Sequence, residues 1–225
     1  MDGAHDLGGM HGFGPVVEPG SDLPYHDRWE PRVHAMFRLI GLWDLGAGPS
    51  GRSTREEMPP AEYLSASYYQ RWLWSAERRL ARRGTIAPGE VEEMMARLAA
   101  GEPEPRRSDP GMARRAAAGM RGRARRLPPA ENARYAAGDR VRVRRMRPER
   151  HTRCPRYVRG AVGTIERVHG MDALPELAAY GEPATPEPVY AVRFDSSDLW
   201  GADAQPSWTV LVDLWEHYLE AVELQ

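Results

Sequence analysis

The feature that most constrains the fold is a change in the spacing of apolar residues along the chain. Between residues 29 and 99, apolar side chains recur every three or four positions, as in amphipathic helices. From residue 141 onward they alternate with polar side chains, as in β-strands. Residues 101–134 lie between these regions, are rich in Pro, Gly, Ala and Arg, and show no apolar period. The 225-residue chain is therefore predicted to be an α+β protein with two domains.

Three longer helices are predicted in the first half. One spans residues 29–45 and carries Phe37 on its apolar side, and another spans residues 88–99. The clearest follows Ser67, which forms a capping-box pattern with Gln70, and ends at Gly84. Its aromatic stripe is typical of a packed helix face.

A short helix is predicted between the helix at residues 29–45 and the helix that follows Ser67. Ser53 and Glu56 form a second capping-box pattern there. This cap would place Arg52 just outside the helix start. A cation is disfavoured there by the helix dipole, so the position hints at a role elsewhere, although a solvated arginine is the simpler explanation.

The second half predicts four or five short strands, which include residues 141–143, 157–168, 189–194 and 208–214. That number in about ninety residues is typical of a small barrel, and SH3-like closure is the natural expectation. The predicted domains are an extended arm (1–28), a helical domain (29–100), a linker (101–134) and an SH3-like β-barrel (135–225). The arm contains six glycines and several apolar side chains, which need a surface on this chain or on a partner chain.

Charge is unevenly distributed, although the net charge is only −1. Residues 106–159 contain 18 arginines and 4 acidic residues, whereas residues 160–225 contain 2 arginines and 12 acidic residues. A nucleic-acid-binding module with an SH3-like barrel would explain the basic segment. All 31 cationic side chains are arginine, however, so the composition of the source accounts for part of the excess.

Several functional classes are disfavoured by the sequence. No apolar run is long enough to span a membrane and no secretory signal is evident, so a cytoplasmic location is expected. Cys154 stands alone, which excludes a disulfide or a Cys-built metal site within the chain. We find no nucleophile elbow, phosphate-binding loop, HExxH or CxxC motif. These features favour a subunit that contributes to a site rather than one that holds a complete catalytic centre.

Several motifs resemble the β subunit of nitrile hydratase, in the right order and over nearly the whole chain except the linker. They are MDGAHDLGGMHGFGPV at the start, Trp29-Glu30, MPPAEYLSASYYQRW, AGDRVRV, HTRCPRYVRGAVGTI, HG, YAVRF, DLWG and VDLWEHYLE.

The resemblance implies a nitrile-hydrating lyase that is active only with an α subunit, in a heterotetramer of two α and two β subunits. A non-corrin Co(III) or non-haem Fe(III) would lie in the α subunit on a loop of oxidised cysteines, and this chain would bind no cofactor or metal itself. Arg52, six residues before Met58, and Arg153 of the HTR motif would donate hydrogen bonds to the cysteine oxygens. A guanidinium suits this role because its planar donors stay charged and can bind two oxyanions. Tyr68 and Trp72 match substrate-pocket positions.

One departure from the family concerns the residues before Arg52, where larger apolar side chains are common. This chain has Gly48-Pro49-Ser50-Gly51 instead. A pocket with Gly48 and Gly51 in its wall would be more open and accept bulkier nitriles, unless a neighbouring side chain fills the gap.

Three alternatives stay open alongside this interpretation. A maturation chaperone resembling the N-terminal half would lack the HTRCPRYVRG and DLWEHYLE motifs. Thiocyanate hydrolase uses a related centre, but its β-like portion resembles two separate chains. The third is the nucleic-acid-binding module. Arg156 and Arg159 are expected to be structural or interface groups, and no role is assigned to Cys154.

Overall fold

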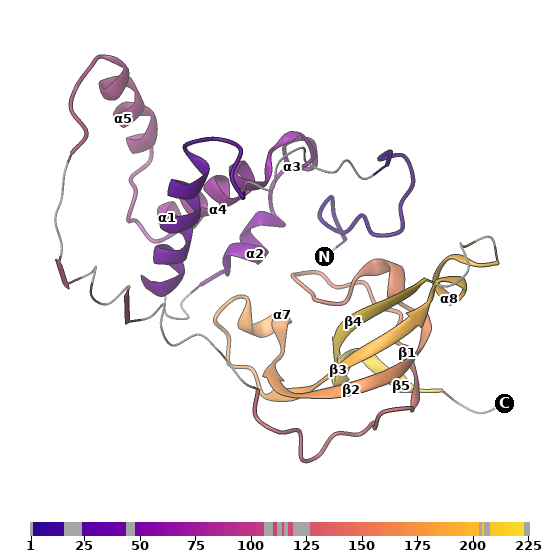
Figure 1. Cartoon of the computed structure of the whole chain (residues 1–225). Helices are drawn as coiled ribbons and strands as arrows, with labels where there is room; N and C mark the ends of the chain where they lie inside the picture. The colour runs from indigo at the N-terminus through magenta and orange to yellow at the C-terminus, as the bar shows by residue number, and fades with distance from the viewer. Residues whose placement is uncertain are drawn as a thin grey trace. The chain divides into compact units, whose positions relative to one another are not determined.

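The computed structural model describes residues 2–15, 24–43, 48–105, 110–111, 114, 117–118, 127–202, 204 and 208–222 (Figure 1). Two compact units are present. The helical unit spans Gly20–Arg125, and the sheet unit joins Met1–Pro19 to Arg126–Gln225. The expected combination of an N-terminal helical region and a C-terminal antiparallel sheet is confirmed. Within the described residues, no helix is both long and apolar enough to cross a membrane.

Five helices of the helical unit have both of their bounds within the described residues. They are α1 (Glu30–Trp43), α2 (Gly51–Arg55), α3 (Pro60–Ser65), α4 (Tyr68–Arg82) and α5 (Glu90–Ala99). The predicted capping box of α4 is confirmed, because Ser67 accepts from the Gln70 amide while the Gln70 side chain accepts from the Ser67 amide. Gly84 follows this helix with φ of +66°, the left-handed conformation that ends helices.

Helix α2 packs closely on α4 because small side chains lie between them. Ser53, Thr54 and Ala76 are buried, and the buried Ser75 hydroxyl donates to the Gly51 carbonyl oxygen at 3.0 Å. These contacts fix the start of α2, and therefore Arg52, relative to the middle of α4.

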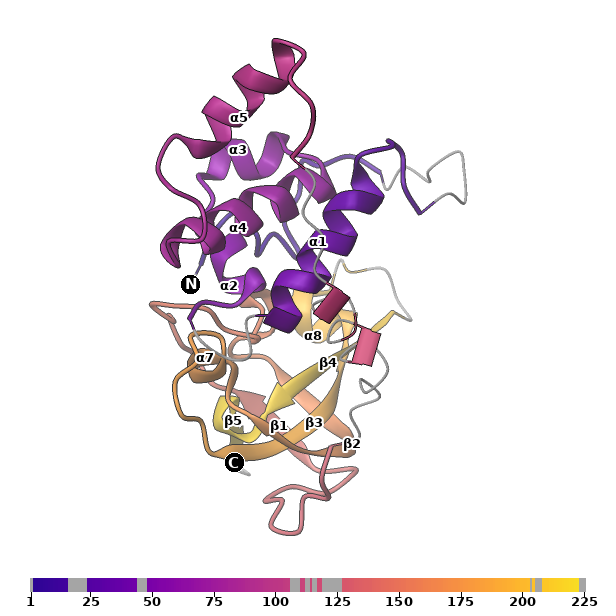
Figure 2. The same ribbon diagram turned by 90° about the vertical axis from the view of Figure 1, so that its left-hand side faces the viewer.

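The sheet unit, which Figure 2 shows in a second view, contains antiparallel strands. Five of them form one sheet in the order β4-β3-β2-β1-β5. They are β1 (Arg140–Val143), β2 (Val162–Ala173), β3 (Pro186–Asp195), β4 (Thr209–Trp215) and β5 (Leu219–Ala221). Short helices α7 (Pro175–Ala178) and α8 (Ser196–Trp200) and two 3₁₀ turns, η1 (Arg156–Val158) and η2 (Glu216–Tyr218), connect them. Among the described residues β4 and β5 do not pair, so the sheet is open and SH3-like closure stays a prediction.

The predicted strand at residues 157–168 is displaced in the structure. It begins at Val162, because Arg156–Val158 forms a 3₁₀ turn and Gly160 takes a φ of +84°. Gly163 is needed where the strand approaches β3, since a Cβ there would lie 2.8 Å from the Arg193 carbonyl oxygen. The strands enclose one core built mainly from alternating side chains: Tyr135, Val141, Val143, Cys154, Val158, Ile165, Val189, Tyr190, Val192, Phe194, Leu214, Trp215, Tyr218 and Leu219.

Residues 2–10 of the N-terminal arm contact the sheet unit of the same chain, whereas residues 11–15 are exposed. Gly8 and Gly9 pass the stacked rings of Tyr157 and Trp200, and a Cβ at Gly8 would lie 2.7 Å from Cε1 of Tyr157. Glycine therefore permits the close approach. The first part of the arm therefore packs on its own chain, while the apolar side chains of Met10 and Phe13 are 49% and 60% exposed.

Candidate functional site

Arg52 lies in the first turn of α2 with an exposed side chain. The prediction that Ser53 caps this helix is wrong, because Ser50 is the cap. Ser50 is extended, with φ of −65° and ψ of 159°, and its hydroxyl accepts from the Ser53 amide at 3.1 Å. Ser53 is helical and buried instead, and its hydroxyl donates to the Ser50 carbonyl oxygen. Arg52 is thus held inside the helix rather than outside its start.

Tyr68 and Trp72 lie together on α4, as expected for two residues four positions apart. Their ring centroids are 5.4 Å apart, and the ring of Phe37 from α1 lies 4.5 Å from that of Trp72. Tyr68 is 60% exposed, so it offers an accessible ring face beside the more buried Trp72. Tyr25, His34 and Tyr69 continue this aromatic cluster.

The space beside Gly51 is filled by Phe37. A Cβ at position 51 would overlap Cζ of the Phe37 ring and lie 2.9 Å from its Cε1. The alternative in which a neighbouring side chain fills the gap is therefore the one that the structure adopts. Gly48 differs, since its φ is +87° and a Cβ added there would meet no described atom within 4 Å.

Arg55 adds a cation to this cluster that the sequence did not single out. Its guanidinium lies 5.5 Å from the Phe37 centroid and 5.1 Å from the Trp72 centroid, within cation–π range. Burial lowers the pKa of Arg55 below its ordinary value. Its position in a five-residue helix gave no periodic signal, so only the packing reveals it.

Arg153 is exposed in the loop of residues 152–154 of the sheet unit, and its backbone is tied to the core. The Arg153 amide donates to the Tyr218 hydroxyl at 3.3 Å, and the Thr152 hydroxyl donates to the same oxygen at 3.4 Å. Tyr218 in turn donates to both carboxylate oxygens of Glu176 at 2.7 and 2.8 Å. Burial raises the pKa of the fully buried Tyr218, so the phenol keeps its proton for this bond.

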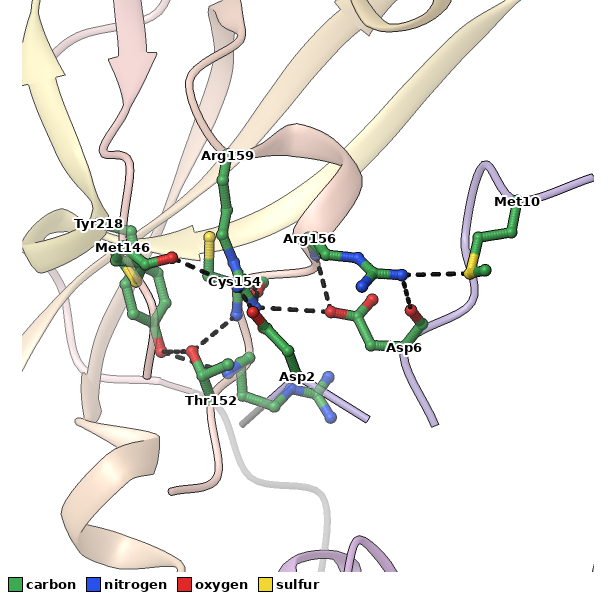
Figure 3. Close-up of polar contacts among 10 residues, drawn as sticks. Asp2, Asp6, Met10, Met146, Thr152, Cys154, Arg156, Arg159 and Tyr218 are labelled. Atoms are coloured by element: carbon green, nitrogen blue, oxygen red, sulfur yellow. Dashed lines mark hydrogen bonds and ion pairs between the residues drawn. The ribbon is translucent and has the colours of Figure 1, made fainter. Parts of the chain in front are cut away.

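Arg159 holds the other end of this loop, as Figure 3 shows. Its side chain is 6% exposed, and Nε and Nη2 donate to the Cys154 carbonyl oxygen at 3.2 and 3.0 Å. Asp2 and Asp6 from the arm form ion pairs with the same guanidinium. Arg156 also contacts the arm, because its amide donates to Asp6 at 2.9 Å. Arg156 and Arg159 therefore each make specific contacts within the chain, whereas a uniform basic patch would leave them in solvent.

The thiol of Cys154 faces the core and is fully buried. Burial raises its pKa to about 12, so it stays protonated at neutral pH and is a poor ligand or nucleophile. Among the residues that the structure describes, no group of three or more His, Cys, Asp or Glu side chains could hold a metal ion.

Comparison with known proteins places these features in a family. Residues 1–118 match the family described as "Nitrile hydratase beta subunit, N-terminal", and residues 124–221 match "Nitrile hydratase beta subunit, C-terminal". The chain is 35% identical to the "Low-molecular weight cobalt-containing nitrile hydratase subunit beta" of Rhodococcus rhodochrous, over 97% of this chain and 99% of that one. It is 34% identical to the nitrile hydratase subunit beta of Pseudomonas putida, over 98% and 99% of the two chains.

Two further similarities complete the comparison. The chain is 32% identical to the "Cobalt-containing nitrile hydratase subunit beta" of Pseudonocardia thermophila, over 99% of this chain and 97% of that one. A solved structure of the thiocyanate hydrolase apo-enzyme from Thiobacillus thioparus is 28% identical, with a TM-score of 0.42 over 52% of this chain and 100% of that one.

Arg52 of the helical unit and Arg153 of the sheet unit are both exposed, and the described residues contain no group that could hold a metal ion. The chain belongs to the nitrile hydratase beta subunit family. Membership of a beta-subunit family implies a partner alpha subunit.

Proposed function

We propose that this chain is the β subunit of a nitrile hydratase, a lyase that converts a nitrile into the corresponding amide when the chain is assembled with an α subunit. The observation that carries the proposal is the match of both family regions, together with exposed Arg52 and Arg153 at the two predicted motif positions. The proposal includes a heterotetramer of two α and two β subunits, closure of the sheet into an SH3-like barrel, and a cytoplasmic location.

The proposed metal is Co(III) or Fe(III) in the α subunit, and the cobalt-containing relatives favour cobalt. Bound there, it would supply Lewis acidity toward the nitrile or water. In the proposed complex this chain would hold the metal's ligand set rather than the metal itself. Arg52 and Arg153 would each donate charge-assisted hydrogen bonds, worth about 1.5–3 kcal/mol apiece, to oxidised cysteine oxygens of the partner.

The substrate's organic group is proposed to contact the aromatic cluster of the helical unit. Tyr68 offers an exposed ring, and Trp72 and Phe37 form a wall beside Gly51. Gly48 would line the same pocket from the turn before α2, where its positive φ favours glycine. Because Phe37 fills the space at Gly51, we expect Phe37 rather than an open gap to limit substrate size.

The test is co-expression with an α subunit of the family, followed by metal analysis and an assay of amide formation from benzonitrile and acetonitrile. We expect metal in the complex and amide product. The Arg52→Lys, Arg153→Lys double variant keeps both charges but loses the planar fork, so its kcat should fall by roughly 100-fold. Wild-type activity in that variant would falsify the two-arginine role.

The same complex distinguishes the alternatives. Hydrolysis of thiocyanate in preference to nitriles would favour a thiocyanate hydrolase-type enzyme. Binding to DNA or RNA that weakens steeply between low and physiological salt would favour a nucleic-acid-binding protein. Association with the α subunit that persists over that salt range supports the proposed function.

A further inference from the structure

The arm and the Arg153 loop are joined by one buried side chain, that of Arg159. About 150 residues of sequence separate Asp2 and Asp6 from Arg159, yet both carboxylates pair with its guanidinium. The same guanidinium donates to the Cys154 carbonyl oxygen through two nitrogens, and Nη1 also donates to the Met146 carbonyl oxygen at 3.4 Å. Arg159 thus links the arm to the carbonyl group of Cys154, the residue after Arg153 (Figure 3).

The backbone around Arg153 is held from both sides. On one side its amide donates to the Tyr218 hydroxyl, and on the other the carbonyl oxygen of Cys154 accepts from Arg159. The Cys154 amide donates to the Thr152 hydroxyl at 3.1 Å, which closes the short loop on itself. Tyr218 lies in η2 and belongs to the hydrophobic core, whereas the Arg159 contact depends on charges that the arm supplies.

We propose that Asp2 and Asp6 of the N-terminal arm, acting through Arg159, are positioning residues that set the direction of Arg153. This inference rests on the proposed role of Arg153 in the partner's ligand set. None of the three side chains needs to touch the substrate or the metal for this role.

The physical reason is that a buried guanidinium needs counter-charges to stay buried. With Asp2 and Asp6 present, Arg159 stays 6% exposed and keeps its forked bond to Cys154. Without them, the guanidinium gains by turning toward water, and the Cys154 carbonyl loses its donors. The hydrogen bond from Arg159 lowers the pKa of Asp2, so the carboxylate remains charged at neutral pH.

A second contact carries the arm's influence into the same segment. Asp6 accepts from the Arg156 amide at 2.9 Å, and the Arg156 guanidinium donates to the Asp6 carbonyl oxygen at 3.4 Å. The side chain of Asp6 is only 12% exposed, whereas Arg156 at the other end of these bonds is exposed. Loss of Asp6 therefore releases the segment at two points, beside Cys154 and at Arg156.

The test uses the full-length chain in complex with its α subunit and the Asp2→Ala, Asp6→Ala double variant. Hydrogen exchange of the peptide that covers residues 151–158 should quicken. The value of kcat should fall by roughly 10- to 100-fold, because Arg153 would no longer point correctly at the partner's ligand set. KM should stay within about threefold, because no substrate contact is removed. Asp195→Ala, which removes an exposed pair with Arg193 on the same unit, should change none of these three quantities.

The decisive comparison repeats the arm substitutions in an Arg153→Lys background. If the arm acts through Arg153, the arm substitutions should lower kcat by less than about threefold in the Arg153→Lys background. A purely structural role would give the same fold loss of kcat in both backgrounds and would overturn the inference. Wild-type kcat in the arm variant, with Arg153→Lys impaired, would overturn the inference alone. Wild-type kcat in Arg153→Lys would overturn the proposed role of Arg153 and the arm's role together, and absence of amide formation in the unmutated complex would overturn the proposed function itself. Should the double variant not assemble, Asp6→Asn, which preserves side-chain volume, takes its place in the same comparison.

Discussion

The ring of Phe37 occupies the position where a side chain at residue 51 would stand. Phe37 lies on α1 and Gly51 begins α2. The hydroxyl of Ser75 on α4 donates to the Gly51 carbonyl oxygen and so holds the start of α2 against α4. A side chain at position 51 and a ring at position 37 therefore compete for one volume.

Gly51→Ala is expected to destabilise the protein by about 1–3 kcal/mol, the usual cost of overpacking. Phe37→Ala in the same chain should remove most of that penalty, which a double-mutant cycle from urea unfolding measures. Phe37→Ala alone should raise turnover of benzonitrile relative to acetonitrile. Equal substrate ratios in Phe37→Ala and the wild type would contradict a role for this ring in limiting substrate size.

Ser50 is expected to matter more than an exposed serine nearby. Ser50→Ala removes the cap of α2 and should cost about 1 kcal/mol in the free energy of unfolding. It should also lower kcat, because α2 carries Arg52. Ser65→Ala serves as the control, since that exposed hydroxyl only donates back to carbonyl oxygens of its own helix, and should stay within about 0.5 kcal/mol. Equal losses for the two variants would argue against Ser50 as the cap.

Tyr218→Phe tests the sheet-side support of Arg153. The change removes the acceptor for Thr152 and the Arg153 amide and leaves the Glu176 carboxylate without its phenol donor. We expect a loss of about 1–3 kcal/mol in thermal or urea unfolding, together with a lower kcat. Tyr180→Phe is the matched control, because its hydroxyl accepts one backbone bond, from His151 at 3.3 Å, and its loss should be smaller. A wild-type melting temperature for Tyr218→Phe would show that the network contributes no stability.

The elements that the sequence predicted well are those specified by local chemistry. The apolar spacing located α4 and β3, and the Ser67–Gln70 pair located a helix start. The α2 cap was misplaced because Ser50 and Ser53 both have a capping side chain, and the choice depends on which one packs against α4. Local patterns cannot decide that.

The contacts that the sequence missed join distant segments. Nothing near Asp6 indicates that it pairs with Arg159, since the partners are 153 positions apart. The same holds for Phe37 and Gly51, where the absence of a side chain at one position is meaningful only once the opposing ring is placed. The predicted roles of Arg52, Arg153, Tyr68, Trp72, Gly48 and Gly51 come from family resemblance and stay proposals until the variants are measured.

Cys154 provides a test of the loop that does not depend on catalysis. Because its thiol is buried and its pKa is raised to about 12, a thiol reagent such as DTNB should label the native protein very slowly and the urea-unfolded protein at once. Above the ordinary pKa of 9.0 the unfolded thiol ionises while the folded one keeps its proton. Stability should therefore fall as pH rises from 9.0 toward 12, by up to about 1.4 kcal/mol per pH unit.

Cys154→Ala isolates this effect from the other groups that titrate in the same range. It lacks the thiol, so its stability should decline less than that of the wild type between roughly pH 8 and roughly pH 10. The small cavity that it creates lowers stability equally at both pH values and cancels in the difference. Parallel pH profiles for the two proteins, or rapid labelling of the native thiol, would mean that Cys154 is open to water and that the Arg159 bond to its carbonyl oxygen does not close the loop over it.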